Sequence, residues 1–177
     1  MHIIQIGYNS IHDRGYRADY PDGTQGYMLI VLKTPAVFEL YGEKNLAESN
    51  SIVIYDKKTP HCYSAVGDIF INDWIHFDTD YDADFFKSLN LPLNSIIRFG
   101  DVDFISSIIR NLCSEFYSVN PKRNEMLDCL LKAMLIKAVW ITTPDILKEE
   151  LKRRSAMLMK YGIMFFPYAR NILSSLR

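Results

Sequence analysis

The chain has few of the features that mark secreted, membrane or nucleic-acid-binding proteins. Its 177 residues include three cysteines, and the formal net charge at pH 7 is -1. Three widely spaced cysteines give no disulfide framework, and a net charge near zero gives no overall field that attracts a polyanion. The N-terminus lacks a basic segment, and no stretch reaches about 18 uncharged apolar residues. We therefore expect a soluble cytoplasmic protein with no membrane partner.

Sequence signatures of common catalytic sites are also missing. The chain contains no G-x-S-x-G, H-E-x-x-H, P-loop or dinucleotide-binding fingerprint. A metal site on a small β-barrel needs a His-x-His cluster with a carboxylate, but Tyr63 stands where the second histidine after His61 would be. We expect no catalytic residue, no metal site and no cofactor.

The first half of the chain has the pattern of an all-β domain. Turn residues recur at short intervals, as in PDGTQG at 21–26 and DKKTP at 56–60, and the segments between them are rich in β-branched and aromatic residues. Short, evenly spaced strands of this kind predict an antiparallel sandwich or barrel. From about residue 82 the apolar period becomes helical. The predicted fold class is α+β, with an N-terminal antiparallel β jelly-roll followed by C-terminal α-helices.

The predicted strand FINDWIHFD, residues 70–78, has two unlike faces. One face carries Phe70, Asn72, Trp74 and His76, and the other carries Ile71, Asp73, Ile75 and Phe77. We expect the Trp74 face to look into the barrel together with Tyr63 and Phe38, and the Ile75 face to lie under the helices. Aromatic rings flanked by amide and imidazole groups suit stacking on a sugar ring with hydrogen bonds to its hydroxyls. The alternative is an aromatic core whose polar tips are satisfied internally.

The two predicted helices carry a wide apolar stripe. Its width exceeds what one barrel face needs, which favours a second contact surface formed by helix pairing between subunits. The alternative is that the helices simply pack on the barrel. The residues expected at a dimer contact are Ile105, Ile109, Leu112, Leu127, Leu131, Met134 and Leu135.

The order of these motifs resembles the N-terminal sensor domain of AraC/XylS-family transcription regulators. The resemblance covers about residues 13–142, and it is carried by the run GYMLIVLKTPAVFELYGEKNLAESNSIVIYDKKTPHCYSAVGDIFINDWIHF. It implies a cupin-like barrel that binds a small effector, often a sugar, followed by two helices that pair antiparallel across a homodimer. DNA is implied as a partner only through a separate module with two helix-turn-helix units.

By position, the resemblance also assigns roles to individual residues. Trp74 resembles the family's aromatic platform for the sugar ring, Tyr63 and Asn72 resemble polar residues of the same pocket, and His61 and His76 match motif positions. The segment that includes Arg14, Tyr16, Arg17 and Tyr20 resembles an N-terminal arm that folds over the pocket, where Arg17 would reach the ligand. The expected ligand-binding set is Trp74, Tyr63, Asn72, His76, His61, Phe38 and Arg17.

The predicted organisation has four parts. Residues 1–25 form the N-terminal arm and first strand, 26–80 the cupin-like barrel core, 81–142 the helical dimerisation region, and 143–177 a linker helix and a divergent tail. No pattern of a DNA-reading helix follows Arg154, so the chain is expected to be a truncated or frame-shifted gene product or a stand-alone sensor.

The leading hypothesis is a non-catalytic domain of a transcription regulator that senses a small molecule, most simply a sugar, and dimerises. The alternative is a metal-dependent cupin enzyme that acts on a sugar or small metabolite through His61 and His76.

Overall fold

The structure, a computed structural model, describes residues 1–80, 82–142 and 153. Residues Met1–Thr142 form one compact unit. The linker helix and tail predicted for 143–177 lie outside the described residues, apart from Arg153. In the described part of the chain, no helix is long and apolar enough to span a membrane.

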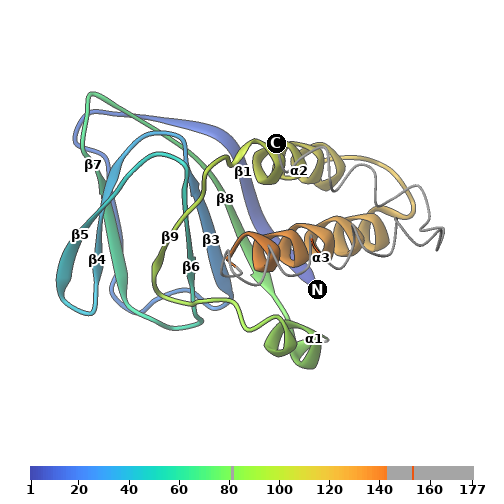
Figure 1. Cartoon of the computed structure of the whole chain (residues 1–177). Helices are drawn as coiled ribbons and strands as arrows, with labels where there is room; N and C mark the ends of the chain where they lie inside the picture. Colours follow the sequence, from blue (N-terminus) through green and yellow to red (C-terminus); the bar gives the residue numbers. More distant parts are fainter. Residues whose placement is uncertain (81, 143–152, 154–177) are drawn as a thin grey trace. The chain divides into compact units, whose positions relative to one another are not determined.

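The described strands form two antiparallel sheets that face each other across an aromatic interior (Figure 1). The five-stranded sheet has the order β1 (His2–Asp13), β8 (Ile69–Asp78), β3 (Tyr27–Leu32), β6 (Ser51–Tyr55) and β9 (Ile96–Arg98). The four-stranded sheet has the order β2 (Arg17–Tyr20), β7 (His61–Ala65), β4 (Ala36–Leu40) and β5 (Glu43–Ala47). This arrangement confirms the predicted α+β jelly-roll.

The inner faces of the two sheets form the barrel core. Alternation along each strand turns one set of side chains inward, and these include Met28, Ile30, Phe38, Tyr55, Tyr63 and Phe70, all 2% exposed or less. Several aromatic rings pack together in this core. Phe38 and Tyr63, from the paired strands β4 and β7, stack with ring centroids 5.4 Å apart.

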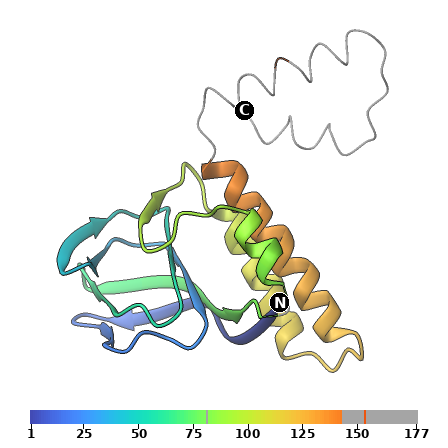
Figure 2. The ribbon, with the colours of Figure 1, turned by 90° about the horizontal axis from the view of Figure 1, so that it is seen from below.

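The helices cover the outer face of the five-stranded sheet (Figures 1 and 2). They are α1 (Ala83–Ser88), α2 (Asp103–Phe116) and α3 (Arg123–Thr142). A second core forms between them and the sheet, with Ile75 and Phe77 of β8 on the sheet side. The apolar faces of α2 and α3 therefore pack against other elements of the same chain.

The predicted dimer residues are part of this second core. All seven are 7% exposed or less, and they are Ile105, Ile109, Leu112, Leu127, Leu131, Met134 and Leu135. Their assignment to a contact between subunits is wrong. The apolar stripe is wide because each long helix packs both on the sheet and on the other helix. Each helix therefore buries apolar residues on two adjacent sides.

Two predicted boundaries also differ from the structure. The range 1–25 contains β1 and β2, both paired within sheets, instead of an arm that precedes the barrel. The range 81–142 contains β9, which pairs with β6 and extends the five-stranded sheet. A strand as short as Ile96–Arg98 has too few residues for alternation to be recognised in the sequence.

Candidate functional site

The two faces of β8 divide as the sequence predicted. Phe70 and Trp74 pack in the barrel core, whereas Ile75 and Phe77 pack under the helices. Asn72 lies on the Trp74 face and is 1% exposed. The strand therefore brings an indole, an amide and an imidazole toward the interior of one barrel.

Aromatic rings from both sheets meet around two of the predicted histidines. His61 stacks between Tyr55 and Tyr20, with ring centroids 3.9 Å and 4.8 Å away. The ring of His76 lies 6.3 Å from Tyr20 and 5.6 Å from Trp74. We call Tyr20, Tyr55, His61, Trp74 and His76 the histidine cluster. Its members come from β2, β6, β7 and β8, so they come together only when the barrel is folded.

Several buried polar atoms in this region have no hydrogen-bond partner among the described residues. They are the hydroxyl of Tyr55, Nε2 of His61, Nε2 of His76 and both amide atoms of Asn72. Leaving such a group unpaired in a protein interior costs about 1–3 kcal/mol. Most buried polar groups in native proteins are paired, so a concentration of unpaired ones on one set of inward-facing residues calls for an explanation, and a bound polar molecule is one.

The protonation of these groups follows from their surroundings. Burial lowers the pKa of His61 and His76, and for His76 the nearby His61 lowers it further. His61 Nδ1 lies 2.8 Å from the carbonyl oxygen of Thr59, which only accepts, so Nδ1 carries the proton and Nε2 is an acceptor. Burial raises the pKa of Tyr55, which therefore keeps its hydroxyl proton as a donor. The histidine cluster thus offers hydrogen-bond donors and acceptors that carry no charge.

A metal centre does not fit this arrangement. Within residues 1–80 and 82–142, no three His, Cys, Asp or Glu side chains come together in a way that could hold a metal ion. His61 and His76 supply two imidazoles, whereas catalytic zinc sites use three protein ligands. The rest of the histidine cluster consists of two phenols and an indole.

Phe38, Tyr63 and Arg17 are not members of the histidine cluster, although the ring of Phe38 lies 6.3 Å from that of Tyr55. Phe38 and Tyr63 are packed within the barrel core, where they contact each other. Arg17 lies apart from the histidine cluster, because alternation along β2 turns Ala18 inward and leaves Arg17 on the outer face of the sheet. There its Nη2 atom lies 3.4 Å from the Asp19 carboxylate. Its assignment to the ligand-binding set stays a prediction.

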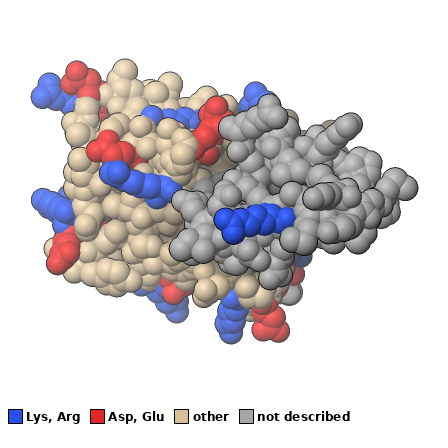
Figure 3. All heavy atoms as spheres, viewed as in Figure 1, with Lys and Arg blue, Asp and Glu red and all other residues tan. Residues whose placement is uncertain are grey.

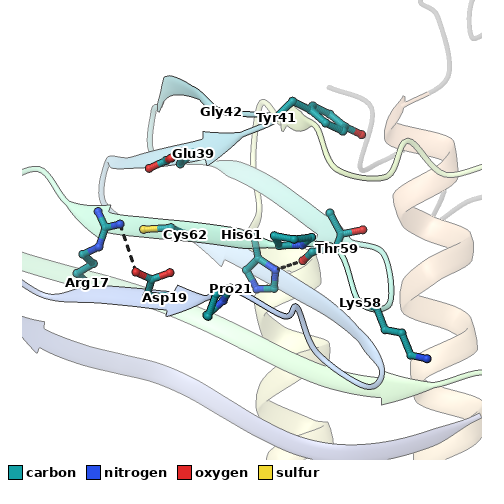
Figure 4. A pocket seen from close by; sticks show the side chains of 11 residues that line it. Arg17, Asp19, Pro21, Glu39, Tyr41, Gly42, Lys58, Thr59, His61 and Cys62 are labelled. Carbon is teal, nitrogen blue, oxygen red and sulfur yellow. Dashed lines mark hydrogen bonds and ion pairs between the residues drawn. The ribbon is translucent and has the colours of Figure 1, made fainter.

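A cavity of about 490 Å³ lies on that outer side of the four-stranded sheet (Figure 4). Arg17 and Lys58 contribute positive charge to its lining, and Asp19 and Glu39 contribute negative charge, so the charged groups balance. His61 also lines this cavity and belongs to the histidine cluster. The cavity therefore borders the cluster at His61.

The face of the molecule in Figure 3 carries scattered charges of both signs, with no large area of one sign among the described residues. The described part of this face therefore gives no electrostatic footprint for nucleic acid.

The sequence did not identify three residues in and around the histidine cluster, which are Tyr20, Tyr55 and Asp73. Tyr20 was placed in an arm, although its alternation with Ala18 would have indicated an inward position on a strand. Asp73 is fully buried in the middle of β8, next to Trp74. An acid on an otherwise apolar strand face was the signal for it, because a buried carboxylate requires partners.

Comparison with known proteins gives the fold a context. The chain matches no protein-family model and no curated protein. Among solved structures it is similar to ToxT from Vibrio cholerae O395 bound to (E)-4-(8-methylnaphthalen-1-yl)but-3-enoic acid, with TM-score 0.53 and 13% identity over 100% of this chain and 72% of ToxT. It is also similar to the AraC-like transcriptional activator CuxR, with TM-score 0.53 and 9% identity over 74% of this chain and 50% of CuxR. The chain therefore shares its fold with ToxT and with the AraC-like activator CuxR, a β-barrel followed by helices.

Proposed function

We propose that this chain is the sensing and dimerisation domain of a cytoplasmic AraC-type transcription regulator, that it is not an enzyme, and that its effector is a sugar. The observation that carries the proposal is the set of unpaired buried polar atoms on Tyr55, His61, Asn72 and His76. A ligand held among them would supply the missing hydrogen bonds.

The chemistry of the histidine cluster favours a neutral, hydroxyl-rich ligand. Each sugar hydroxyl both donates and accepts, which matches the donor on Tyr55 and the acceptor on His61. The C–H face of a sugar ring packs well on an aromatic ring such as the indole of Trp74.

A carboxylate ligand fits the cluster less well. The ToxT structure contains a carboxylic acid, and a carboxylate in a dry site requires a positive partner. In the histidine cluster that charge would have to come from His61 or His76, and burial lowers the pKa of both. The cavity that His61 borders is the route by which we expect the ligand to enter.

Thermal unfolding with a panel of mono- and disaccharides, and with amphipathic carboxylic acids as a second arm, tests the proposal. A ligand at 100 times its dissociation constant adds about 2.7 kcal/mol to the free energy of unfolding. The measurement uses a Trp140→Phe protein, in which Trp74 is the remaining tryptophan. We expect one sugar to raise the melting temperature and change Trp74 fluorescence, and His76→Phe to abolish both effects. A response to the acids alone would contradict the sugar assignment.

The proposed homodimer uses the opposite side of α3 from the one the sequence indicated. Met126 and Ile136 are 46% and 53% exposed, and Cys129 and Ala133 are also exposed. These four residues are three, four and three positions apart, which is the spacing of a helix-pairing seam. We call them the α3 stripe.

Sedimentation of the Ile136→Glu protein tests the dimer. A charge in the α3 stripe is expected to give a monomer with an unchanged barrel. Val119→Glu is the matched control, because Val119 is fully exposed in the loop between α2 and α3 and lies outside the α3 stripe. A monomeric native protein would contradict the proposed dimer.

The alternative of a metal-dependent enzyme acting through His61 and His76 has less support, because these residues lack the third ligand that such a centre needs. Metal analysis of protein purified without added metal distinguishes the two. Near-stoichiometric iron, manganese or zinc would favour the enzyme.

A further inference from the structure

Asp73 is a fully buried carboxylate between the barrel and the helices. The backbone N–H of Asn9 donates to its Oδ1 at 2.7 Å, and the Lys33 ammonium lies 2.7 Å from the same oxygen. The Ser106 hydroxyl donates to Oδ2 at 2.6 Å. These partners belong to β1, to the residue that follows β3 and to α2. A buried charge is tolerated only with such partners, so the carboxylate holds all three elements in one arrangement.

Trp74, the next residue along β8, faces the barrel and is bonded to the same part of β1. Its Nε1–H donates to the Ser10 hydroxyl at 2.9 Å. Gly7 pairs with Trp74 across the two strands, and a β-carbon on Gly7 would lie 2.3 Å from Nε1. The indole therefore lies directly against β1.

The segment Tyr8–Ser10 of β1 touches both sides of β8. The strand register shifts between Gly7 and Ser10, so that Tyr8 and Asn9 stand opposite Asp73 alone. Asn9 adopts a left-handed conformation with φ of 48°. Ser10 holds the indole on the barrel side, and Asn9 holds the carboxylate on the helix side. We call Tyr8–Ser10 the β1 bulge.

We propose that the β1 bulge and Asp73 transmit the state of the barrel interior to α2. This inference rests on the proposed function, in which a ligand takes the face of Trp74. Movement of the indole alters its bond to Ser10 and shifts the bulge. Asp73 follows because Asn9 is one of its few partners in a dry interior, and Ser106 carries the shift into α2. The device thereby links effector binding to α2, the helix that packs on α3.

A double-mutant cycle on urea unfolding tests the coupling without any ligand. The two changes are Ser10→Ala, on the barrel side, and Ser106→Ala, on the helix side. Two side chains that share no partner normally have multiplicative effects on the unfolding equilibrium constant, within about twofold. We expect the combined effect to depart from the product of the single effects by at least about threefold, and the departure to vanish when Asp73→Asn is added.

The matched control cycle pairs Ser10→Ala with Ser107→Ala. The Ser107 hydroxyl bonds to the carbonyl of Phe104 within the same helix, so its effect is expected to be multiplicative with that of Ser10. A second readout needs no change at Asp73. Amide hydrogen exchange over Asp103–Leu112 of α2 is expected to be at least about threefold faster in the Trp74→Phe protein, with little change over Met126–Ala138 of α3.

A multiplicative Ser10–Ser106 cycle together with unchanged exchange in α2 would overturn the coupling. A departure equal to that of the control cycle would do the same. Neither result bears on whether the barrel binds a sugar, and an unresponsive sugar panel would leave the cycle unaffected. The failure of this inference and the failure of the proposed function are therefore distinguishable.

Discussion

Gly7 and Trp74 face each other across β1 and β8 at a distance that no other residue than glycine allows, since a β-carbon on Gly7 would lie 2.3 Å from the indole nitrogen. The fit sets the position of the tryptophan that the proposed ligand would contact. It also makes the position sensitive to a single methyl group.

We predict that Gly7→Ala displaces Trp74. Inserting a methyl group into a closely packed site costs about 1–3 kcal/mol of unfolding free energy, and the fluorescence of Trp74 should change at the same time. Urea unfolding in a Trp140→Phe background measures both. Gly67→Ala is the matched control, because a β-carbon there meets nothing within 4 Å. Equal effects of the two substitutions would contradict the close contact.

We predict that the free energy of unfolding falls as the pH is lowered from 7 to 5. His61 and His76 have a pKa below the ordinary histidine value in the folded state, so the unfolded chain binds protons that the folded chain does not. Their contribution to stability is complete above the unfolded pKa of about 6.5 and is lost as the pH falls toward the folded pKa, by up to about 1.4 kcal/mol per pH unit for each residue.

Urea unfolding of His61→Phe and His76→Phe proteins at several pH values checks this prediction. Each substitution should flatten the dependence, whereas substitution of the exposed His2 by Gln should leave it as it is. An unchanged slope in both Phe variants would show that other groups control the pH dependence.

We predict that Asp73→Asn and Lys33→Met each destabilise the fold strongly. Removing one member of a buried ion pair costs about 3–5 kcal/mol, because the other charge stays buried without its partner. Lys33 is partly exposed, with a side-chain exposure of 21%, so its loss should cost less than that of Asp73. The comparison is Asp68→Asn, which breaks an ion pair with Arg14 between two almost fully exposed side chains and should cause no measurable change.

The local pattern of the sequence carried enough information for the barrel and for the orientation of β8. Alternation assigns Trp74 and Ile75 to opposite faces without knowledge of any partner strand. It could not reveal that His61 of β7 stacks on Tyr55 of β6, because this contact joins strands of different sheets and depends on how the sheets face each other. Nor could it reveal the β1 bulge, since a register shift is a property of the strand pair.

For the helices, too, the sequence pattern could not reveal which elements contact each other. Helical periodicity identifies apolar residues, but it does not say whether a residue meets the sheet, the neighbouring helix or a second subunit. Leu131 and Ile136 are both apolar residues of α3, yet Leu131 is 0% exposed and Ile136 is 53% exposed. The residues predicted for the dimer contact are all of the buried kind, although exposed residues alone are free to meet another chain.

We predict that Leu131 contributes mainly to the stability of the fold and that Ile136 contributes mainly to self-association. Leu131→Ala should lower the free energy of unfolding by about 2–5 kcal/mol, because it leaves a cavity between α3 and the sheet. Ile136→Ala should change the unfolding free energy of the isolated chain little, since its side chain is already half in water, but it should weaken self-association. Urea unfolding and sedimentation at several protein concentrations measure the two properties on the same samples. Loss of self-association in Leu131→Ala alone, with Ile136→Ala unchanged, would return the contact between subunits to the buried side of the helix.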